Sequence, residues 1–136
     1  MEMIISFEDG KKVNAEYKGM TIKTDQPVKA GGSGSAPEPF SLFLASIGTC
    51  AGIYVKSFCD QREIPSSGIR LVQTMNYNPE KRLIDKISID IQLPDGFPEK
   101  YRDAVIKAAD LCTVKKHLAS PPVITVQAGY DNQQDR

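Results

Sequence analysis

Three cysteines and one histidine are the side chains of this sequence best suited to nucleophilic chemistry: Cys50, Cys59, Cys112 and His117. A cysteine reacts as its thiolate, whereas an inert cysteine on an apolar helix face behaves as a small hydrophobic core residue. Cys50 and Cys59 are nine residues apart on one predicted helix, so they fall on roughly opposite faces and cannot pair within it. Cys59 lies near the charged end of that helix and is interpreted as a core residue.

Cys50 and Cys112 are the remaining pair of thiols. Each lies on the apolar stripe of a different predicted helix, so the two thiols can meet if those helices pack together. Small residues surround Cys50, at positions 48–49 before it and 51–52 after it. These small side chains allow either close helix packing or a substrate pocket beside the thiol, and both interpretations stay open.

Other kinds of site find less support in the sequence. There is no Cys-x-x-Cys or His-x-x-x-His spacing for a metal, and Cys112 and His117 point about 140° apart around a helix. His117 follows Lys115 and Lys116 and is interpreted as a surface residue. Neither a local Ser-His-Asp signature nor a phosphate-binding glycine loop is found. We therefore expect no metal and no cofactor.

The charge balance argues against polyanionic partners. Lys plus Arg and Asp plus Glu number 17 each, so no basic excess is available for a phosphate backbone or an anionic membrane surface. The uncharged run from 39 to 55 is shorter than the roughly 20 apolar residues of a membrane span and predicts a buried helix. We expect neither nucleic acid nor a membrane as partner.

The length and the cysteine count indicate the class of protein. The 136 residues, 40% hydrophobic and 25% charged, are typical of one soluble globular domain covering residues 1–136. The N-terminal residues lack the basic region and apolar core of a signal peptide. With an odd number of cysteines and no export signal, we expect a cytoplasmic protein with reduced thiols.

The predicted elements mix strands and helices without regular alternation, which favours an α+β fold. Alternating apolar residues predict strands, and three- and four-residue steps predict helices. Along the chain these are strands 3–7, 13–17 and 20–24, a helix from 39 stopped by Pro65, strands 69–77 and 86–93, a helix from Pro98 through Cys112, a helical turn within 113–122, a strand 123–128 and a polar tail 130–136. The Gly-, Ser- and Pro-rich segment 25–39 is predicted to be a flexible connector or a lid.

Two motifs resemble the OsmC/Ohr family of thiol-dependent hydroperoxide reductases. "PEPFSLFLASIGTCAGIYV" resembles the helix that carries the reactive cysteine of the family. The positions that fit are Pro39, Leu42, Ala45, Ser46, Gly48 and Cys50. "AADLCTVKKHLASPPVITV" resembles the second-cysteine segment, with Thr113 where proline is common. The strand order and the "GG" before the first helix also match, so the resemblance covers nearly the whole chain.

The resemblance implies a particular fold. In it, antiparallel sheets wrap two central helices in an intertwined homodimer, and the active sites lie at the subunit interface. Such a dimer would account for a first helix that is apolar on nearly every side, because a second subunit removes from water what one subunit leaves exposed.

The resemblance also implies an activity. Cys50 would attack a hydroperoxide, and Cys112 would resolve the resulting sulfenic acid to a disulfide. The expected substrate is a small hydroperoxide, and the expected reductant is a cellular dithiol that the sequence does not identify.

The groups that would activate Cys50 differ from the pattern of the family. Its best-studied branch has a glutamate about ten residues before the first cysteine, and this glutamate orients an arginine from the N-terminal strands. Here Phe40 and Ser41 occupy those positions, and the first arginine is Arg62. Glu38 and Lys12 are the candidate substitutes, although a lysine lacks the planar fork that pairs with a carboxylate.

Two other functions stay open. The same scaffold could bind a small apolar or thiol-reactive molecule with little turnover, which the missing glutamate and arginine favour. Alternatively, both cysteines could be core residues of a purely structural dimer.

Overall fold

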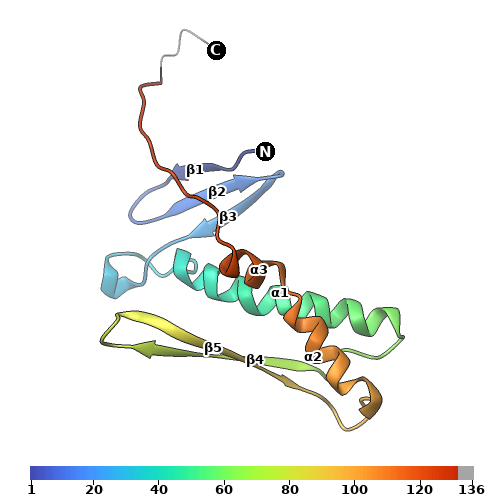
Figure 1. Ribbon diagram of the computed structural model, residues 1–136. Helices are drawn as coiled ribbons and strands as arrows, with labels where there is room; N and C mark the ends of the chain where they lie inside the picture. Colours follow the sequence, from blue (N-terminus) through green and yellow to red (C-terminus); the bar gives the residue numbers. More distant parts are fainter. Residues whose placement is uncertain (132–136) are drawn as a thin grey trace.

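The structure is a computed structural model, and it describes residues 1–131. It has an α+β fold with small antiparallel sheets and three α-helices, as expected. In Figure 1 the long helix α1 lies between a three-stranded sheet and a two-stranded hairpin. The elements are β1 (Ile4–Phe7), β2 (Val13–Tyr17), β3 (Met20–Thr24), the 3-10 helix η1 (Val28–Ala30), α1 (Pro39–Gln61), β4 (Arg70–Asn78), β5 (Leu83–Gln92), the 3-10 helix η2 (Glu99–Tyr101), α2 (Arg102–Asp110) and α3 (Thr113–Ala119).

Helix α1 begins where a proline suits its first turn. Pro39 needs no helical hydrogen bond for its nitrogen at this position, and Glu38 before it is extended. The helix ends at Gln61, four residues before the predicted stop at Pro65, because Glu63 takes a left-handed conformation with φ 55°. Arg62 closes this end, with its guanidinium 3.7 Å from the centre of the Phe58 ring and a 3.1 Å hydrogen bond to the Phe58 carbonyl.

The observed length of α1 changes one expectation. The helix has 23 residues and is long and apolar enough to cross a membrane by length and composition alone, a test that core helices of soluble proteins also pass. Only 28% of its most apolar 18 residues are buried within the subunit. The helix therefore keeps a large apolar surface that no other part of residues 1–131 covers.

The hairpin β4–β5 presents one apolar face toward α1. Its register pairs Leu71 with Ile91, Gln73 with Ile89 and Met75 with Ile87, so these six side chains share one face. A register shift between Asn76 and Tyr77 breaks the alternation beyond Met75. Gln73 is the one polar side chain in this set, and it is placed against the helix.

The buried core gathers at the C-terminal half of α1. Val55, Phe58 and Cys59 pack against Val105 of α2, and apolar side chains of the hairpin complete the cluster. The Phe58 and Tyr101 rings meet edge to face with centroids 5.8 Å apart. This core fixes α2 against α1, and therefore fixes where the chain leaves α2 toward Cys112.

The segment 25–39 is more ordered than predicted. Asp25 is fully buried and accepts hydrogen bonds from the hydroxyls of Ser33 and Ser35, at 2.7 and 2.6 Å, and from three backbone N–H groups. These bonds, led by the Ser35 hydroxyl, hold the pKa of the Asp25 carboxyl well below its usual range. The sequence analysis, which predicted a flexible connector or a lid, overlooked a carboxylate that satisfies the donors of this glycine- and serine-rich loop.

Two predictions for the C-terminal third were wrong. The second helix was expected to run through Cys112, but α2 ends at Asp110 and Cys112 begins a separate helix. Residues 121–131 form no strand, and Val123, Ile124 and Val126 are 92%, 82% and 94% exposed. A strand needs a neighbour for its backbone hydrogen bonds, and the subunit offers none to 123–128. Of the predicted polar tail 130–136, residues 132–136 lie outside the described part.

Candidate functional site

Cys112 occupies the junction between α2 and α3, directly against α1. It is the N-cap residue of α3, and its sulfur accepts a hydrogen bond from the backbone N–H of Lys115 at 3.5 Å. Its thiol also lies 3.9 Å from the carbonyl oxygen of Ile47, one turn before Cys50 on α1. Cys112 is buried, whereas Cys50 is partly exposed, and both are free thiols.

Cys50 faces the start of α3. The pKa of the Cys50 thiol is lowered, first by the backbone N–H of Val114, although burial works in the opposite direction. The Cys112 thiol and the backbone N–H and hydroxyl of Thr113 also favour its thiolate. Donors favour the charged form of a thiol. The two cysteines singled out in the sequence therefore lie at the same contact between α1 and the start of α3.

A hydrogen bond between two hydroxyl groups closes this arrangement. The hydroxyl of Tyr54, one helical turn after Cys50, lies 2.9 Å from that of Thr113. The sequence analysis overlooked Tyr54, Thr113 and Val114 as groups around the thiol. The four-residue step from Cys50 to Tyr54 places both on one face of α1 and is the signal that could have identified Tyr54.

Cys59 has the opposite environment. It is fully buried in the core, and burial raises the pKa of its thiol, followed by the charge of Asp60. Its interpretation as a core residue is confirmed.

The two candidate activating residues lie elsewhere in the subunit. The Lys12 ammonium group is 3.5 Å from the Asp9 carboxylate, in the turn that joins β1 to β2. Glu38 is the N-cap residue of α1, twelve residues before Cys50, or about 18 Å along the helix axis. Neither is among the groups that shift the Cys50 pKa. His117 is exposed, as expected, and bonds to the Thr113 carbonyl at 2.8 Å.

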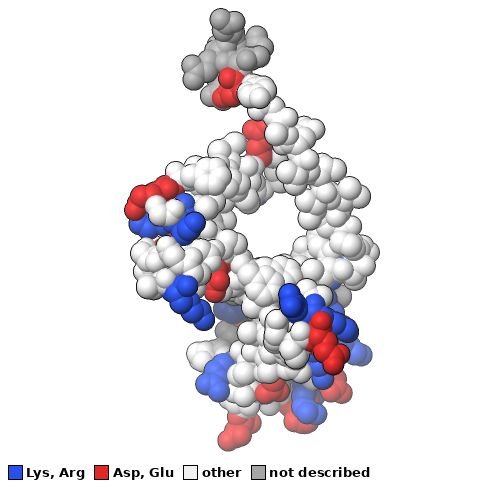
Figure 2. Space-filling model, turned by 90° about the vertical axis from the view of Figure 1, so that its left-hand side faces the viewer, with Lys and Arg blue, Asp and Glu red and all other residues white. Residues whose placement is uncertain are grey.

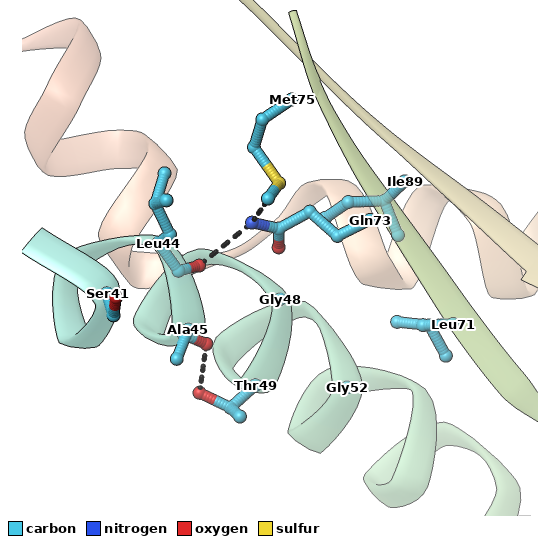
Figure 3. A pocket seen from close by; sticks show the side chains of 10 residues that line it. All are labelled: Ser41, Leu44, Ala45, Gly48, Thr49, Gly52, Leu71, Gln73, Met75 and Ile89. Carbon is cyan, nitrogen blue, oxygen red and sulfur yellow. Dashed lines mark hydrogen bonds between the residues drawn. The ribbon is translucent and has the colours of Figure 1, made fainter. Parts of the chain in front are cut away.

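A cavity lies on another face of α1. It has a volume of about 510 Å³ between α1 and the hairpin, and Figure 3 shows the ten residues that line it. The helix contributes small residues, which include Gly48 and Gly52. Cys50 is not among the lining residues. The small residues around Cys50 thus border a groove, but the groove is not beside the thiol.

One polar side chain crosses this apolar groove. Gln73 reaches from β4 to α1, where its amide nitrogen donates to the Leu44 carbonyl at 3.0 Å (Figure 3). A Cβ atom on Gly48 would lie 2.5 Å from the Gln73 side-chain oxygen, so glycine leaves room for this contact. The lining of the groove is therefore mainly apolar, and its one amide side chain, Gln73, is already hydrogen-bonded to α1.

A second cavity and a smaller pocket adjoin the cysteine site. The cavity, of about 310 Å³, is lined by Ile47 and Ala51 of α1 together with isoleucines of β5. The pocket, of about 290 Å³, opens at Cys112 between Leu111 and the lysines Lys115 and Lys116. Among residues 1–131, no group of three or more Cys, His, Asp or Glu side chains could hold a metal ion.

Comparison with solved structures identifies the fold. A protein provisionally described as an osmotic stress induced and detoxification response protein, from Psychrobacter arcticus 273-4, matches with a TM-score of 0.69 and 22% identity over 84% of this chain and 85% of its own. An organic hydroperoxide resistance protein OsmC from Legionella pneumophila matches with a TM-score of 0.51 and 17% identity over 87% and 89%.

A third solved structure carries a ligand. It is provisionally described as an organic hydroperoxide resistance protein from Vibrio cholerae O1 biovar eltor, with captopril bound in one of its active sites. It matches with a TM-score of 0.52 and 18% identity over 89% of this chain and 86% of its own. At these identities the three likenesses establish the fold alone.

Sequence comparison gives the family. A search of curated proteins gave no match. The family model described as OsmC-like protein matches residues 32–127, which include both Cys50 and Cys112. The chain belongs to the family of OsmC-like proteins.

Proposed function

We propose that this protein is a thiol-dependent hydroperoxide reductase in which Cys50 attacks the peroxide and Cys112 resolves the product. The observation that carries the proposal is the contact of the Cys112 thiol with α1 one turn before Cys50, where the start of α3 favours the Cys50 thiolate. A peroxidatic thiol has to be ionised and accessible, and Cys50 is the cysteine of the three that is partly exposed with a lowered pKa.

The proposed reaction has three balanced steps. The Cys50 thiolate attacks the outer oxygen of the hydroperoxide, the O–O bond breaks, and the alcohol leaves with a proton from solvent, so that Cys50 becomes a sulfenic acid. The Cys112 thiol then attacks that sulfur and releases water as the disulfide forms. A cellular dithiol reduces the disulfide by two exchange steps and becomes a disulfide itself.

The substrate and the compartment follow from this chemistry. We propose a small hydroperoxide as substrate, because the residues that surround Cys50 leave it only partly exposed. The protein would act in the cytoplasm, where dithiols keep cysteines reduced. Neither a membrane nor a nucleic acid takes part in the proposed reaction.

We further propose that the active form is an intertwined homodimer with its active sites at the subunit interface. The apolar surface of α1, the small-residue groove beside it and the exposed apolar residues of β1 and the C-terminal segment support this assembly. Figure 2 shows a large opening in one face of the subunit, bordered mainly by uncharged residues, with most Lys, Arg, Asp and Glu outside it. A second copy that entered this opening would cover apolar rather than charged surface.

In this proposed dimer, the C-terminal segment of each copy adds a strand to the sheet of the other copy. Residues 123–128 alternate apolar and polar side chains but have no partner strand in the subunit, and both β1 and β3 are edge strands. We propose that 123–128 pairs with an edge of the three-stranded sheet of the second copy. The strand predicted from the sequence would then form only in the dimer.

Lys12 and Glu38 have a limited place in this proposal. Within one subunit the hydrogen-bond donors around Cys50 lower its pKa without either residue. Any contribution from Lys12 or Glu38 would therefore have to come from the second subunit.

Peroxide turnover with a dithiol reductant tests the proposed function. We expect the parent protein to consume cumene hydroperoxide in the presence of dithiothreitol, and Cys50→Ser to lose this activity. Without dithiothreitol, Cys112→Ser is expected to consume about one equivalent of peroxide and then stop as the Cys50 sulfenic acid. Cys59→Ser is the matched control and should keep the parent rate, because Cys59 is buried in the core. Equal rates in the parent and Cys50→Ser would overturn the proposal.

A second candidate function is favoured by the groove of Figure 3. Its volume of about 510 Å³ and its apolar lining suit a small apolar molecule, and Cys50 is not among its residues. On this hypothesis the protein binds such a molecule with little turnover. Slow loss of thiols without dithiol-dependent turnover, together with saturable binding of an apolar dye that Gly48→Leu abolishes, would favour it over the reductase.

A further inference from the structure

We infer that Tyr54 is a positioning residue of Cys50, and that it acts through Thr113. Its hydroxyl holds that of Thr113 and thereby directs the start of α3, with its hydrogen-bond donors, at the Cys50 sulfur. The inference rests on the proposed role of Cys50 as a reactive thiolate. It concerns the thiol itself, however, and the reactivity of a thiol can be measured without any peroxide.

The geometry that carries the inference joins two distant parts of the chain. Tyr54 follows Cys50 by four residues on α1, so the two side chains lie on the same face one turn apart. Thr113 is 59 residues away in sequence, yet its hydroxyl is 2.9 Å from the phenol oxygen of Tyr54. Cys112, the residue before Thr113, has its sulfur 3.9 Å from the carbonyl oxygen of Ile47, one turn before Cys50. The start of α3 is therefore held against α1 on both sides of Cys50.

Helix α3 depends on such contacts for its position. It has seven residues, which is too short for a helix to be stable alone in water. Its first turn is tied to α1 at two points, by Cys112 near the Ile47 carbonyl and by Thr113 at Tyr54. Removal of the Tyr54 hydroxyl would remove one of these two ties.

The protons along this chain of groups fit a thiolate. An ionised sulfur only accepts hydrogen bonds, so a Thr113 hydroxyl that serves the Cys50 thiolate has to donate to it and accept from Tyr54. Each group then has a partner, and each bond polarises the next. Without the phenol, the Thr113 hydroxyl is free to rotate toward the backbone carbonyls three and four residues before it.

Charged groups near the site do not replace this arrangement. Those on the surrounding elements are Lys56 on α1, Asp110 at the end of α2, and Lys115, Lys116 and His117 on α3. Lys56 is paired with Asp60, and Lys115 is paired with Asp110. The groups that act on Cys50 are hydrogen-bond donors rather than these charges.

Alkylation of the reduced protein by iodoacetamide tests the inference. Peptide mass spectrometry assigns the modified cysteine, and the rate for Cys50 is followed as a function of pH. We expect Tyr54→Phe to slow alkylation of Cys50 at pH 7 by about fivefold, the factor for one hydrogen bond of about 1 kcal/mol, and to move the midpoint of the profile to higher pH. Thr113→Val should do the same, whereas Thr113→Ser should retain the parent rate.

The controls separate positioning from a general structural effect. Tyr101→Phe is the matched control, since its ring packs on Phe58 and no hydrogen bond of its hydroxyl is found among the described residues. The double variant Tyr54→Phe/Thr113→Val should be no slower than Thr113→Val alone, because the phenol acts only through the Thr113 hydroxyl. If Thr113→Val does not fold, the comparison of Tyr54→Phe with Tyr101→Phe and with Thr113→Ser carries the test.

Two results would overturn the inference. One is a Tyr54→Phe profile that coincides with those of the parent and Tyr101→Phe. The other is a Thr113→Ser variant as slow as Tyr54→Phe. Failure of the proposed function is a separate result, because a parent protein that turns over no peroxide can still show the Tyr54-dependent alkylation of Cys50.

Discussion

The thiol of Cys112 lies 3.9 Å from the carbonyl oxygen of Ile47, a residue 65 positions earlier in the chain. Ile47 precedes Cys50 by three residues, so this contact places Cys112 on the side of α1 that carries Cys50. It exists because α2 ends at Asp110 and the chain turns at Cys112 into a new helix. The break between α2 and α3 thus brings two cysteines to one site.

The cysteines should differ in their reactivity with pH. Donors around Cys50 lower its pKa, so its thiolate and its alkylation should persist to lower pH than for an ordinary cysteine. Burial raises the pKa of Cys59, so Cys59 should stay unmodified in the folded protein and react only after unfolding. Site-resolved alkylation between pH 5 and 9 measures both. Faster reaction of Cys59 than of Cys50 at neutral pH would contradict this assignment.

Asp25→Asn should destabilise the fold in a pH-dependent way. The folded-state pKa of this carboxyl is lowered, so its stabilising effect is present above the unfolded-state pKa of about 4 and is lost as the pH falls through the folded-state value. The melting temperature should drop by at least several degrees at pH 7, and the difference from the parent should shrink below about pH 4. A difference that does not change with pH would show that ionisation of Asp25 is not the source of the effect.

Gly32→Ala should disrupt the same loop by a steric route. A Cβ atom at this position would lie 2.0 Å from the backbone oxygen of Gln26 and 2.8 Å from the Asp25 carboxylate. We expect the melting temperature to fall at least as far as in Asp25→Asn. Gly96→Ala is the matched control, because a Cβ atom there meets nothing within 4 Å. Equal melting temperatures of the two glycine variants would exclude the close approach at Gly32.

Gly52→Ala distinguishes a covered α1 from a free one. A Cβ atom at Gly52 meets nothing within 4 Å in the subunit, and alanine stabilises a helix interior by about 1 kcal/mol relative to glycine. If the groove is open to solvent, the variant should be more stable than the parent. The proposed dimer predicts the opposite, namely a lower melting temperature and dissociation at a higher protein concentration. Light scattering after gel filtration measures the mass, and a stabilised monomer would contradict the dimer.

The sequence predicted local structure better than the relations between elements. The isoleucines of β5 and the apolar residues of α1 carried clear periodicity, and the helix and hairpin followed from it. The order in the loop 25–39 could not be predicted, because it depends on Asp25 meeting Ser33 and Ser35 across eight and ten residues. The failure of 123–128 to form a strand has the same origin. Alternation specifies a face but not the neighbouring strand that makes the hydrogen bonds.

The candidate site was predictable in part. The cysteines were visible as residue types, and the resemblance singled out Cys50 and Cys112. The groups that surround Cys50 were not predictable from spacing, because Thr113 and Val114 reach it through a helix break that no strong stop signal marks. The helical periodicity predicts only that the ring of Tyr54 packs on the apolar face of α1. The hydrogen bond of its hydroxyl with Thr113 is a tertiary contact that the sequence does not reveal.

A count of free thiols after one equivalent of an organic hydroperoxide tests the central claim most directly. The account predicts that the reduced parent falls from three free thiols per chain to one, and that peptide mapping finds a disulfide between Cys50 and Cys112. Cys50→Ser should keep both of its thiols, and Cys112→Ser should yield a Cys50 sulfenic acid that dimedone traps. A parent protein that keeps all three thiols would contradict the account.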